Sequence, residues 1–372
     1  MRLACLFLLP GFVAAQLIPV GQPVPQGPNP PVVFLNGYQS GCLGDSSFAA
    51  NFGTADQLLK NSSLVTLYFD NCTVSGKPNI EVLGAAFGQF LAGLKYTDGS
   101  AVTQVDVVAH SMGGLIVRSY LAGKQDTTPA TFNPPAVVPI RRAVFLGTPH
   151  FGSAAASLLG VDSQTTEMAL GSQFLFSLNM WNQGNDDLRG ISAIAVSGSG
   201  GTGVESNLTG FDDGLVTLTS SSLAFTRSGV TRVVPYCHSA SPLLAAFGVC
   251  NSLTPVLNIL STDPNNLVGQ ILISFLTGTD AWKSTGQAAE ANVLASTRAG
   301  VELQLRDQND LLVPVSNGTL PVATPPVTLS ANSGSVVYSE LLAANTPLTI
   351  QLNPVSGSPQ ALSFTLSAGP VT

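Results

Sequence analysis

The chain has 372 residues, of which 45% are hydrophobic and only 9% are charged. Its formal net charge of −7 and its isoelectric point near 4.8 argue against a nucleic-acid partner and against a polybasic membrane-binding patch. The length corresponds to about two domains.

The N-terminus predicts an export signal. Arg2 precedes an apolar stretch, and Val13, Ala14 and Ala15 form a cleavage site typical of secretory signal peptides. We therefore expect a signal peptide over residues 1–15, cut after Ala15, and a secreted or periplasmic protein. A proline-rich segment follows at 16–30. No later apolar run reaches membrane-spanning length without interruption, so we expect no integral membrane span.

Residues 31–280 alternate short hydrophobic strands with helical patterns. The predicted strands lie in PVVFLNGYQSG, NSSLVTLYFDN, VDVV, AVFL and ISAIAVSGSG, and the predicted helices span residues 80–94, 114–121 and 265–278. Such alternation is typical of βαβ units and predicts a mostly parallel sheet flanked by helices.

Two further segments depart from this rhythm. Residues 154–189 contain the amphipathic run SQFLFSLNMWN, which is either an ordinary packed helix or a cap or lid over an apolar pocket. Residues 288–372 contain VELQLRD, PLTIQLN and ALSFTLS, which alternate at period two and predict a small antiparallel β-sandwich. Its two aromatic residues, Tyr338 and Phe364, are expected in the core, which favours a structural or assembly module.

Four cysteines remain after removal of the signal peptide, an even number that suits an oxidising compartment. Three pairings are possible, and the sequence alone does not choose among them. We prefer the sequential pairing, because Cys42 with Cys72 and Cys237 with Cys250 close the shortest loops.

The strongest functional signal is the stretch QVDVVAHSMGGLIVRSYLAG, which places Ser111 between a buried strand and a helix. A turn this tight requires small residues two places on either side of the serine, and Ala109 and Gly113 stand there. The pattern predicts a nucleophile elbow, in which Ser111 Oγ is exposed and the Met112 N–H can donate to an oxyanion.

A serine nucleophile needs a base, and the sequence has only three histidines. His110 is held beside the serine in the elbow, and His150 follows a strand, where a pocket wall or structural hydrogen bonding is expected. His238 lies on a later loop. Because elbow-type sheets carry the triad in the order serine, acid, histidine, only His238 leaves room for an acid in between.

The segment FDDGLVTLTS supplies the acid. Asp213 is the preferred candidate, since an Asp-Gly turn beside a Val-rich segment suits a carboxylate at the carboxyl end of a strand. Asp212 is the reserve candidate, and the alternative is that both are surface carboxylates.

A second oxyanion donor is expected in the loop after the first strand. Asn36 and Gly37 end that strand, which places the Tyr38 N–H opposite Ser111, although a plain glycine turn would give the same pattern. No cysteine or histidine pair has zinc spacing, and phosphate-loop and dinucleotide motifs are absent from the sequence. We expect no metal and no cofactor.

Several motifs together resemble the secreted α/β-hydrolase lipases and esterases, in the branch of bacterial triacylglycerol lipases and GPI inositol-deacylase-like hydrolases. They are VVAHSMGGLIVRSYL, RAVFLGTPHFGS, GSQFLFSLN, DDGLV and the late His238, and the resemblance covers 31–278. It implies an α/β-hydrolase fold with Ser111, Asp213 and His238 as triad and with Tyr38 and Met112 as oxyanion donors. Two positions depart from the common pattern: Ala109 replaces a glycine, and Asn36 stands where histidine commonly precedes glycine.

The sequence therefore predicts a secreted carboxylic-ester hydrolase that acts on hydrophobic acyl esters through an acyl-enzyme. Two alternatives remain at this point. The same triad could serve an acyltransferase, or the scaffold could belong to a non-catalytic secreted binding protein. The expected partner is a small-molecule or lipid ester, and the sequence does not indicate an oligomeric state.

Overall fold

The structure, a computed structural model, describes residues 17–153 without a gap and most of 155–288. The gaps within that part fall at 154, 160, 170–171, 183–186, 202–211, 224–225, 227–229, 240–249, 251–258, 262 and 264. Beyond it, the structure describes the backbones of four strands. The predicted signal peptide, 1–15, and the predicted strand ALSFTLS lie outside the described residues.

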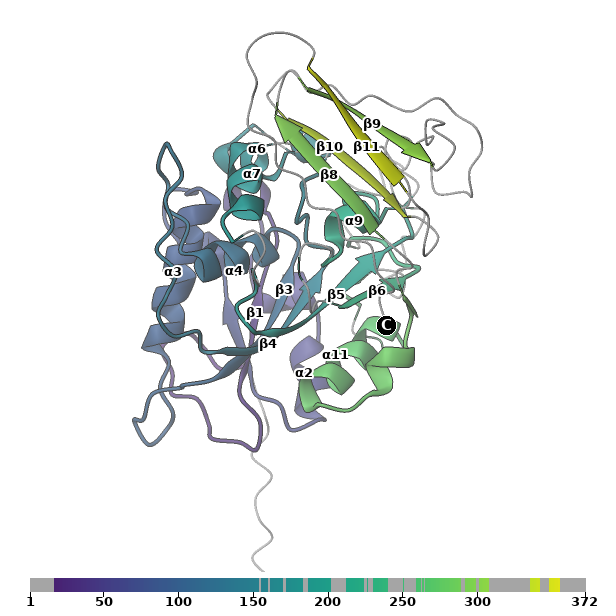
Figure 1. Cartoon of the computed structure of the whole chain (residues 1–372). Helices are drawn as coiled ribbons and strands as arrows, with labels where there is room; N and C mark the ends of the chain where they lie inside the picture. The colour runs from purple at the N-terminus through teal and green to yellow at the C-terminus, as the bar shows by residue number, and fades with distance from the viewer. Residues whose placement is uncertain are drawn as a thin grey trace, which may run out of the picture.

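A central sheet forms the middle layer of the protein, with strand order β2-β1-β3-β4-β5-β6-β7 (Figure 1). The first six strands in this order pair in parallel, and β7 joins antiparallel at the edge beside β6. The strands are β1 (Val32–Leu35), β2 (Thr66–Phe69), β3 (Val105–His110), β4 (Ile140–Leu146), β5 (Ser192–Gly198), β6 (Val230–Val234) and β7 (Gln287–Ala288).

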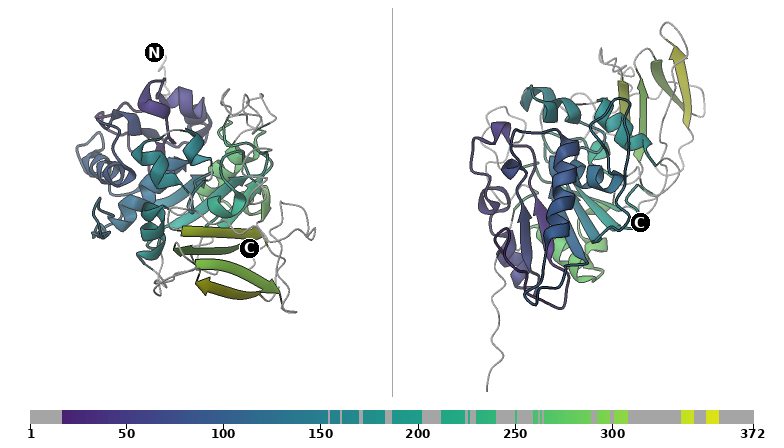
Figure 2. Two further views of the ribbon diagram at one scale, coloured as in Figure 1. Left: turned by 90° about the horizontal axis from the view of Figure 1, so that it is seen from above. Right: turned by 90° about the vertical axis from the view of Figure 1, so that its left-hand side faces the viewer.

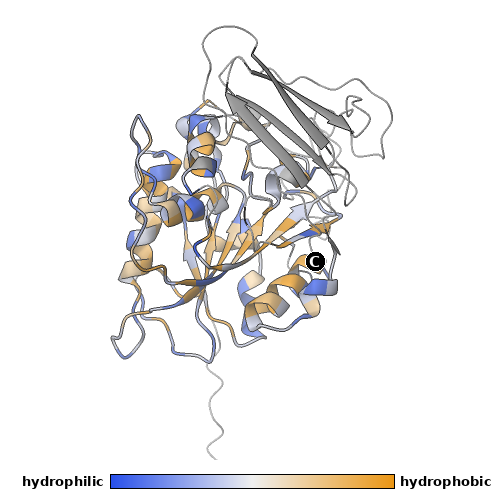
Figure 3. Ribbon diagram, viewed as in Figure 1, coloured by the Kyte–Doolittle hydropathy of each residue, from blue (hydrophilic) through white to orange (hydrophobic). Residues whose placement is uncertain are grey.

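Helices cover both faces of this sheet (Figures 1 and 2). On one face, α3 (Ile80–Gly93) and α4 (Met112–Ala122) pack on a core that includes Val33 and Leu35. On the other face, α1 (Phe48–Phe52), α2 (Ala55–Lys60) and α11 (Leu267–Thr277) pack on a second core that includes Val32 and Phe34. Because both faces are buried, most residues of the strands are hydrophobic, as the orange colouring in Figure 3 shows. The predicted α/β class is confirmed.

The order in which the chain adds strands to the sheet reverses at β1, because β2 lies on one side of it and β3 on the other. In open parallel sheets, ligands bind outside the carboxyl ends of the strands at such a switch point. Leu35 is level with Phe69 on one side and with Ala109 on the other. The residues that follow these three positions therefore meet at one edge of the sheet.

Local capping signals set the ends of the main helices. The Asn79 side chain accepts a hydrogen bond from the Val82 N–H (3.1 Å) and starts α3 at the predicted residue. Gly123 and Gly278 take left-handed conformations, with φ of 57° and 81°, and end α4 and α11. Both glycines were expected from the sequence as helix ends.

Within the segment 154–189, the structure describes α5 (Ala156–Leu159), α6 (Ser163–Met168) and α7 (Gln173–Met180). Phe174, Leu175 and Leu178 of α7 are buried in the same core as α3 and α4. This face of α7 packs as an ordinary amphipathic helix does. A lid movement of the segment stays a prediction.

Shorter helices complete the described chain: η1 (Ser40–Cys42), η2 (Asn71–Thr73), α9 (Leu218–Ser221) and η4 (Ala281–Ser284).

Near the C-terminus, β8 (Asn292–Arg298) pairs antiparallel with β10 (Ser335–Leu341), and β9 (Val301–Asp307) pairs antiparallel with β11 (Leu348–Pro354). These strands are outside the central sheet (Figure 1). The boundaries of a separate β-sandwich over 288–372 stay a prediction. No helix among the described residues has both the length and the apolar character needed to cross a bilayer.

Candidate active site

Ser111 forms a one-residue turn between β3, which ends at His110, and α4, which begins at Met112. Its backbone has φ 52° and ψ −127°, a conformation that residues other than glycine rarely adopt. Gly113 lets β1 approach this turn: a Cβ added there would lie 2.7 Å from the Asn36 carbonyl oxygen. The glycine two places after the serine, Gly113, is therefore required by the packing of α4 against the end of β1.

The start of α4 offers hydrogen-bond donors beside the serine. The first N–H groups of a helix have no partner within the helix, and they carry the positive end of the helix dipole. Met112 is the first residue of α4 and its side chain is fully buried, whereas Ser111 is only half-buried. The Met112 N–H thus lies at the helix end that favours a developing negative charge.

Asp213 and His238 form a buried hydrogen-bonded pair. His238 Nδ1 lies 2.7 Å from Asp213 Oδ2, and the two side chains are 4% and 0% exposed. The other carboxylate oxygen, Oδ1, accepts hydrogen bonds from the N–H groups of Leu215 (3.0 Å) and Val216 (2.8 Å). The His238 N–H donates to the Asp213 carbonyl (2.7 Å). The carboxylate is therefore fixed by its own turn and directed at the imidazole.

This pair lies at the carboxyl ends of neighbouring strands. A Cβ added to Gly147, directly after β4, would lie 2.8 Å from Asp213 Oδ2 and 3.0 Å from His238 Nδ1. A Cβ on Gly198, at the end of β5, would lie 2.6 Å from the Asp213 Cβ. These close approaches place the pair at the edge of the sheet where Ser111 follows β3.

His110 connects the pair to the serine. Its ring centroid is 4.7 Å from that of His238, and its Nε2 lies 3.2 Å from the His238 carbonyl oxygen. Burial and the neighbouring His238 hold the pKa of His110 well below its usual value, so the ring is neutral at pH 7. With its proton on Nε2, His110 donates to the carbonyl of the residue predicted as the base.

Ser111 and His238 thus belong to one cluster, but no hydrogen bond joins their side chains within the part of the chain that the structure describes. In enzymes without substrate, hydrogen bonds between nucleophile and base are often long and tighten on binding. The structure brings Asp213 and His238 together directly and brings Ser111 to them through His110. The complete triad stays a prediction.

His150 has surroundings of a different kind. It is fully buried, and its ring lies edge-on to Phe145 at 5.1 Å between centroids. Its carbonyl accepts a hydrogen bond from the buried Arg118 (3.2 Å). Burial, with a smaller effect of Arg118, holds the pKa of His150 well below its usual value. These contacts suit the structural role expected for this residue.

The loop after β1 packs directly on the serine. A Cβ added to Gly37 would lie 2.8 Å from the Ser111 Cβ and 3.4 Å from its Oγ. Next to it, the Tyr38 hydroxyl donates to the Asp162 carboxylate (2.9 Å), and Asp162 also caps α6. Burial and Asp162 raise the pKa of Tyr38. The loop that carries the predicted second oxyanion donor is therefore tied to the segment 154–189.

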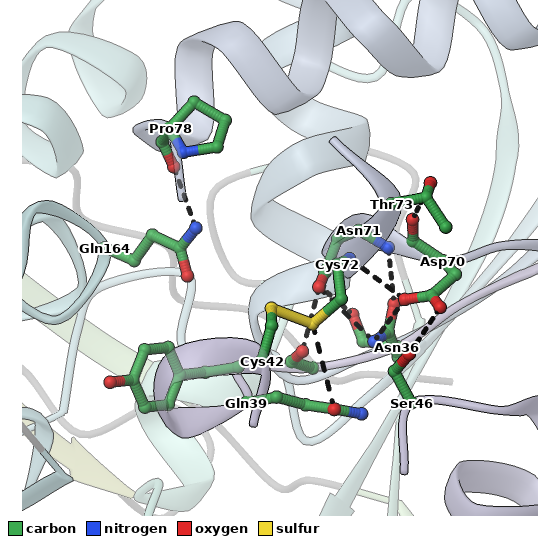
Figure 4. Close-up of a disulfide and its surroundings, with 12 residues drawn as sticks. Asn36, Gln39, Cys42, Ser46, Asp70, Asn71, Cys72, Thr73, Pro78 and Gln164 are labelled. Atoms are coloured by element: carbon green, nitrogen blue, oxygen red, sulfur yellow. Dashed lines mark hydrogen bonds between the residues drawn. A yellow bond between two sulfur atoms is a disulfide. The ribbon is translucent and has the colours of Figure 1, made fainter. Parts of the chain in front are cut away.

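Figure 4 shows a second set of contacts to this loop, which the sequence analysis missed. Asn36 and Asn71 are buried and exchange hydrogen bonds across the ends of β1 and β2. In the sequence, Asn71 was marked only by its place at the end of the predicted strand segment NSSLVTLYFDN.

The structure pairs Cys42 with Cys72 and Cys237 with Cys250, with Cα atoms 5.5 Å and 6.1 Å apart. This is compatible with the sequential pairing. The first bridge joins η1 to η2, beside Asn71, and the second begins one residue before His238.

A buried charged cluster joins α6 to α3. Lys124 forms an ion pair with Glu81 in which both side chains are buried, and the Ile80 N–H donates to Glu167 Oε2 (2.7 Å). Burial, with a smaller contribution from Glu81, raises the pKa of Glu167 to about 8. Near neutral pH, the Glu167 carboxyl group therefore holds a proton. Among the described residues, no group of three or more His, Cys, Asp or Glu side chains is arranged to hold a metal ion.

Comparisons with known proteins agree with this architecture. Residues 31–182 match a family described as "Putative serine esterase (DUF676)". In structure, the chain is similar to phospholipase PlaB from Legionella pneumophila, with a TM-score of 0.59, 15% identity, and coverage of 89% of this chain and 87% of that chain. Bacillus licheniformis lipase BlEst2 in its mature form also matches, with a TM-score of 0.45, 17% identity, and coverage of 69% and 96%. No curated protein matched the sequence. The chain has the α/β-hydrolase fold.

Proposed function

We propose that this chain is a serine esterase, with Ser111 as nucleophile, His238 as general base and Asp213 as the group that orients the imidazole. One observation carries the proposal: a strained serine at a strand-to-helix turn shares its edge of the sheet with a buried Asp–His pair. The family match over 31–182 and the likeness to a phospholipase support the same reaction class.

In the proposed reaction, Ser111 Oγ attacks the acyl carbonyl carbon while its proton passes to His238 Nε2. Asp213 keeps the other imidazole proton on Nδ1. The tetrahedral intermediate then expels the alcohol, which takes the proton from His238, and leaves an acyl-enzyme. Water, deprotonated by the same imidazole, attacks the acyl-enzyme. The second tetrahedral intermediate then releases the carboxylic acid, and Ser111 Oγ takes the proton back from His238.

The N–H groups of Met112 and Tyr38 stabilise the oxyanion of each tetrahedral intermediate. Each is expected to contribute about 3 kcal/mol, by analogy with oxyanion donors removed from other enzymes. Support for Met112 comes from its place at the start of α4, and support for Tyr38 comes from the contact of Gly37 with Ser111.

The proposed substrates are lipid esters or other esters of hydrophobic acyl groups. The low charge content of the chain and the proposed cap within 154–189 favour them. PlaB is a phospholipase and BlEst2 is a lipase.

The proposed location is outside the cytoplasm, in the periplasm or the medium. The signal-like residues 1–15 and the two disulfides support it. N-terminal sequencing of the exported protein should find Gln16 as the first residue. A mature protein that retains residues 1–15 would contradict the location.

The test of the activity is turnover of p-nitrophenyl esters of several chain lengths by the wild type and by Ser111→Ala. Ser119→Ala is the matched control, because Ser119 is buried on the same helix and its hydroxyl has no hydrogen-bond partner among the described residues. We expect turnover and fluorophosphonate labelling in the wild type and in Ser119→Ala, and neither in Ser111→Ala. No turnover of any ester by the wild type, or equal turnover in Ser111→Ala, would refute the proposal.

A further inference from the structure

Asn71 lies at the end of β2, where the paired strands bring it beside the loop that leaves β1. Leu35 is level with Phe69, so Asn36 and Asp70 follow side by side, and Asn71 is the next residue. Asn71 is 5% exposed, and its backbone N–H donates to Asn36 Oδ1 (3.0 Å). Figure 4 shows the two amides facing each other.

The side-chain amide of Asn71 uses both of its N–H bonds on two consecutive carbonyls. Nδ2 donates to the Asn36 carbonyl (3.2 Å) and to the Gly37 carbonyl (2.9 Å). Oδ1 accepts from Asn36 Nδ2 (3.3 Å). An amide combines two donors with an acceptor, whereas an ionised carboxylate of the same size has acceptors only and would repel both carbonyls.

The bond to the Gly37 carbonyl also sets the direction of the next N–H. The Gly37 C=O and the Tyr38 N–H belong to one planar trans peptide, in which the two groups point in opposite directions. Holding the carbonyl against Asn71 therefore turns the Tyr38 N–H away from Asn71. That N–H has no hydrogen-bond partner within the described part of the chain, and Gly37 itself lies against Ser111.

From these contacts we infer that Asn71 is a positioning residue of the oxyanion hole, which fixes the plane of the 37–38 peptide so that the Tyr38 N–H meets the oxyanion. The inference rests on the proposed function. The Cys42–Cys72 bridge and the Tyr38–Asp162 hydrogen bond restrain the loop elsewhere, but neither one holds this peptide plane.

The test compares Asn71→Asp with Asn51→Asp, using p-nitrophenyl ester hydrolysis. Asn51 is the matched control, because its Nδ2 also donates to two carbonyls, those of Ser46 (3.1 Å) and Ser47 (3.0 Å), away from the 37–38 peptide. For Asn71→Asp we expect kcat to fall about 10- to 100-fold, with KM changed less than about threefold, because an oxyanion donor acts mainly in the transition state. Asn51→Asp should keep kcat within about threefold of the wild type.

A measurement on the wild type covers the case in which Asn71→Asp does not fold. In protein labelled with 15N-tyrosine, a trifluoromethyl ketone that forms a tetrahedral adduct on the serine should shift the Tyr38 amide proton strongly downfield. Equal losses of kcat in the two variants, or a Tyr38 amide proton unmoved by the adduct, would overturn the inference. A wild type without Ser111-dependent turnover would instead refute the proposed function and the inference with it.

Discussion

Replacing Gly37 by alanine tests whether the loop after β1 is part of the active site. Gly37 does not have a positive φ, so alanine can adopt its backbone conformation. The obstacle is space: the new Cβ would lie 2.8 Å from the Ser111 Cβ and 3.1 Å from His110 Nδ1. Ser111 is the strained turn itself and His110 is buried at the end of β3, so neither atom can give way as the end of a flexible side chain would.

The size of the effect follows from these distances. Carbon atoms in contact normally lie about 3.5–4.0 Å apart, so the loop and the serine turn must separate by about 1 Å. A displacement of that size in a catalytic arrangement costs about 100-fold in rate. Overpacking of a buried site lowers the free energy of unfolding by about 1–3 kcal/mol. We therefore expect Gly37→Ala to lose about 100-fold in kcat while it remains folded.

The assay is p-nitrophenyl ester turnover, with urea unfolding measured in parallel. Gly44→Ala is the matched control, because it makes the same substitution a few residues later, where an added Cβ has no atom within 4 Å. Gly37→Ala with wild-type kcat, or equal losses of kcat in the two variants, would refute the reasoning.

Three further predictions concern the acid, the charged cluster and the second disulfide. Asp213→Asn should lose about 10⁴-fold in kcat on p-nitrophenyl esters, because the imidazole would take the wrong tautomer, whereas Asp212→Asn should lose less than about tenfold; equal losses would contradict the assignment. Since burial raises the pKa of Glu167 to about 8, the folded state binds the extra proton. The free energy of unfolding should therefore fall by about 2 kcal/mol between pH 5 and 7. In Glu167→Gln this dependence should disappear from urea unfolding, and identical slopes would contradict it. Replacing Cys237 and Cys250 together by serine should lower turnover while far-UV circular dichroism is unchanged; parallel loss of both signals would show that the bridge serves global folding.

The turn at Ser111 and its flanking elements were predicted from the sequence because their signals are local. A β-branched run, small residues around the serine, and a glycine at the helix end determine β3, α4 and the Gly123 cap within 20 residues of one another. The same holds for α3, which begins at the predicted Ile80 because Asn79 caps it. The predicted helix at 114–121 was too short at its start, since Ser111 itself takes the N-cap position.

The surroundings of Asp213 were predicted less well. The sequence indicated an Asp-Gly turn beside a Val-rich segment, but it did not indicate that this turn leads into the short helix α9. The reason lies in the aspartate, whose side chain accepts hydrogen bonds from the N–H groups two and three residues later. The carboxylate that faces His238 thus also folds its own turn.

Contacts between distant segments were not predictable from one sequence. The Tyr38–Asp162 hydrogen bond joins residues 124 positions apart, and the Asn71 amide reaches a carbonyl 34 positions away. Periodicity and turn chemistry identify which elements form. They do not identify which polar side chains meet once the strands have paired.

The backbone of Ser111 also sets a limit on how resistant the protein can be to heat. A serine held at φ 52° and ψ −127° keeps about 1–3 kcal/mol of conformational strain that glycine would not carry. Thermal tolerance and chemical activity therefore select different residues at this one position. Screening variants for survival at high temperature alone would favour glycine there and would enrich inactive proteins.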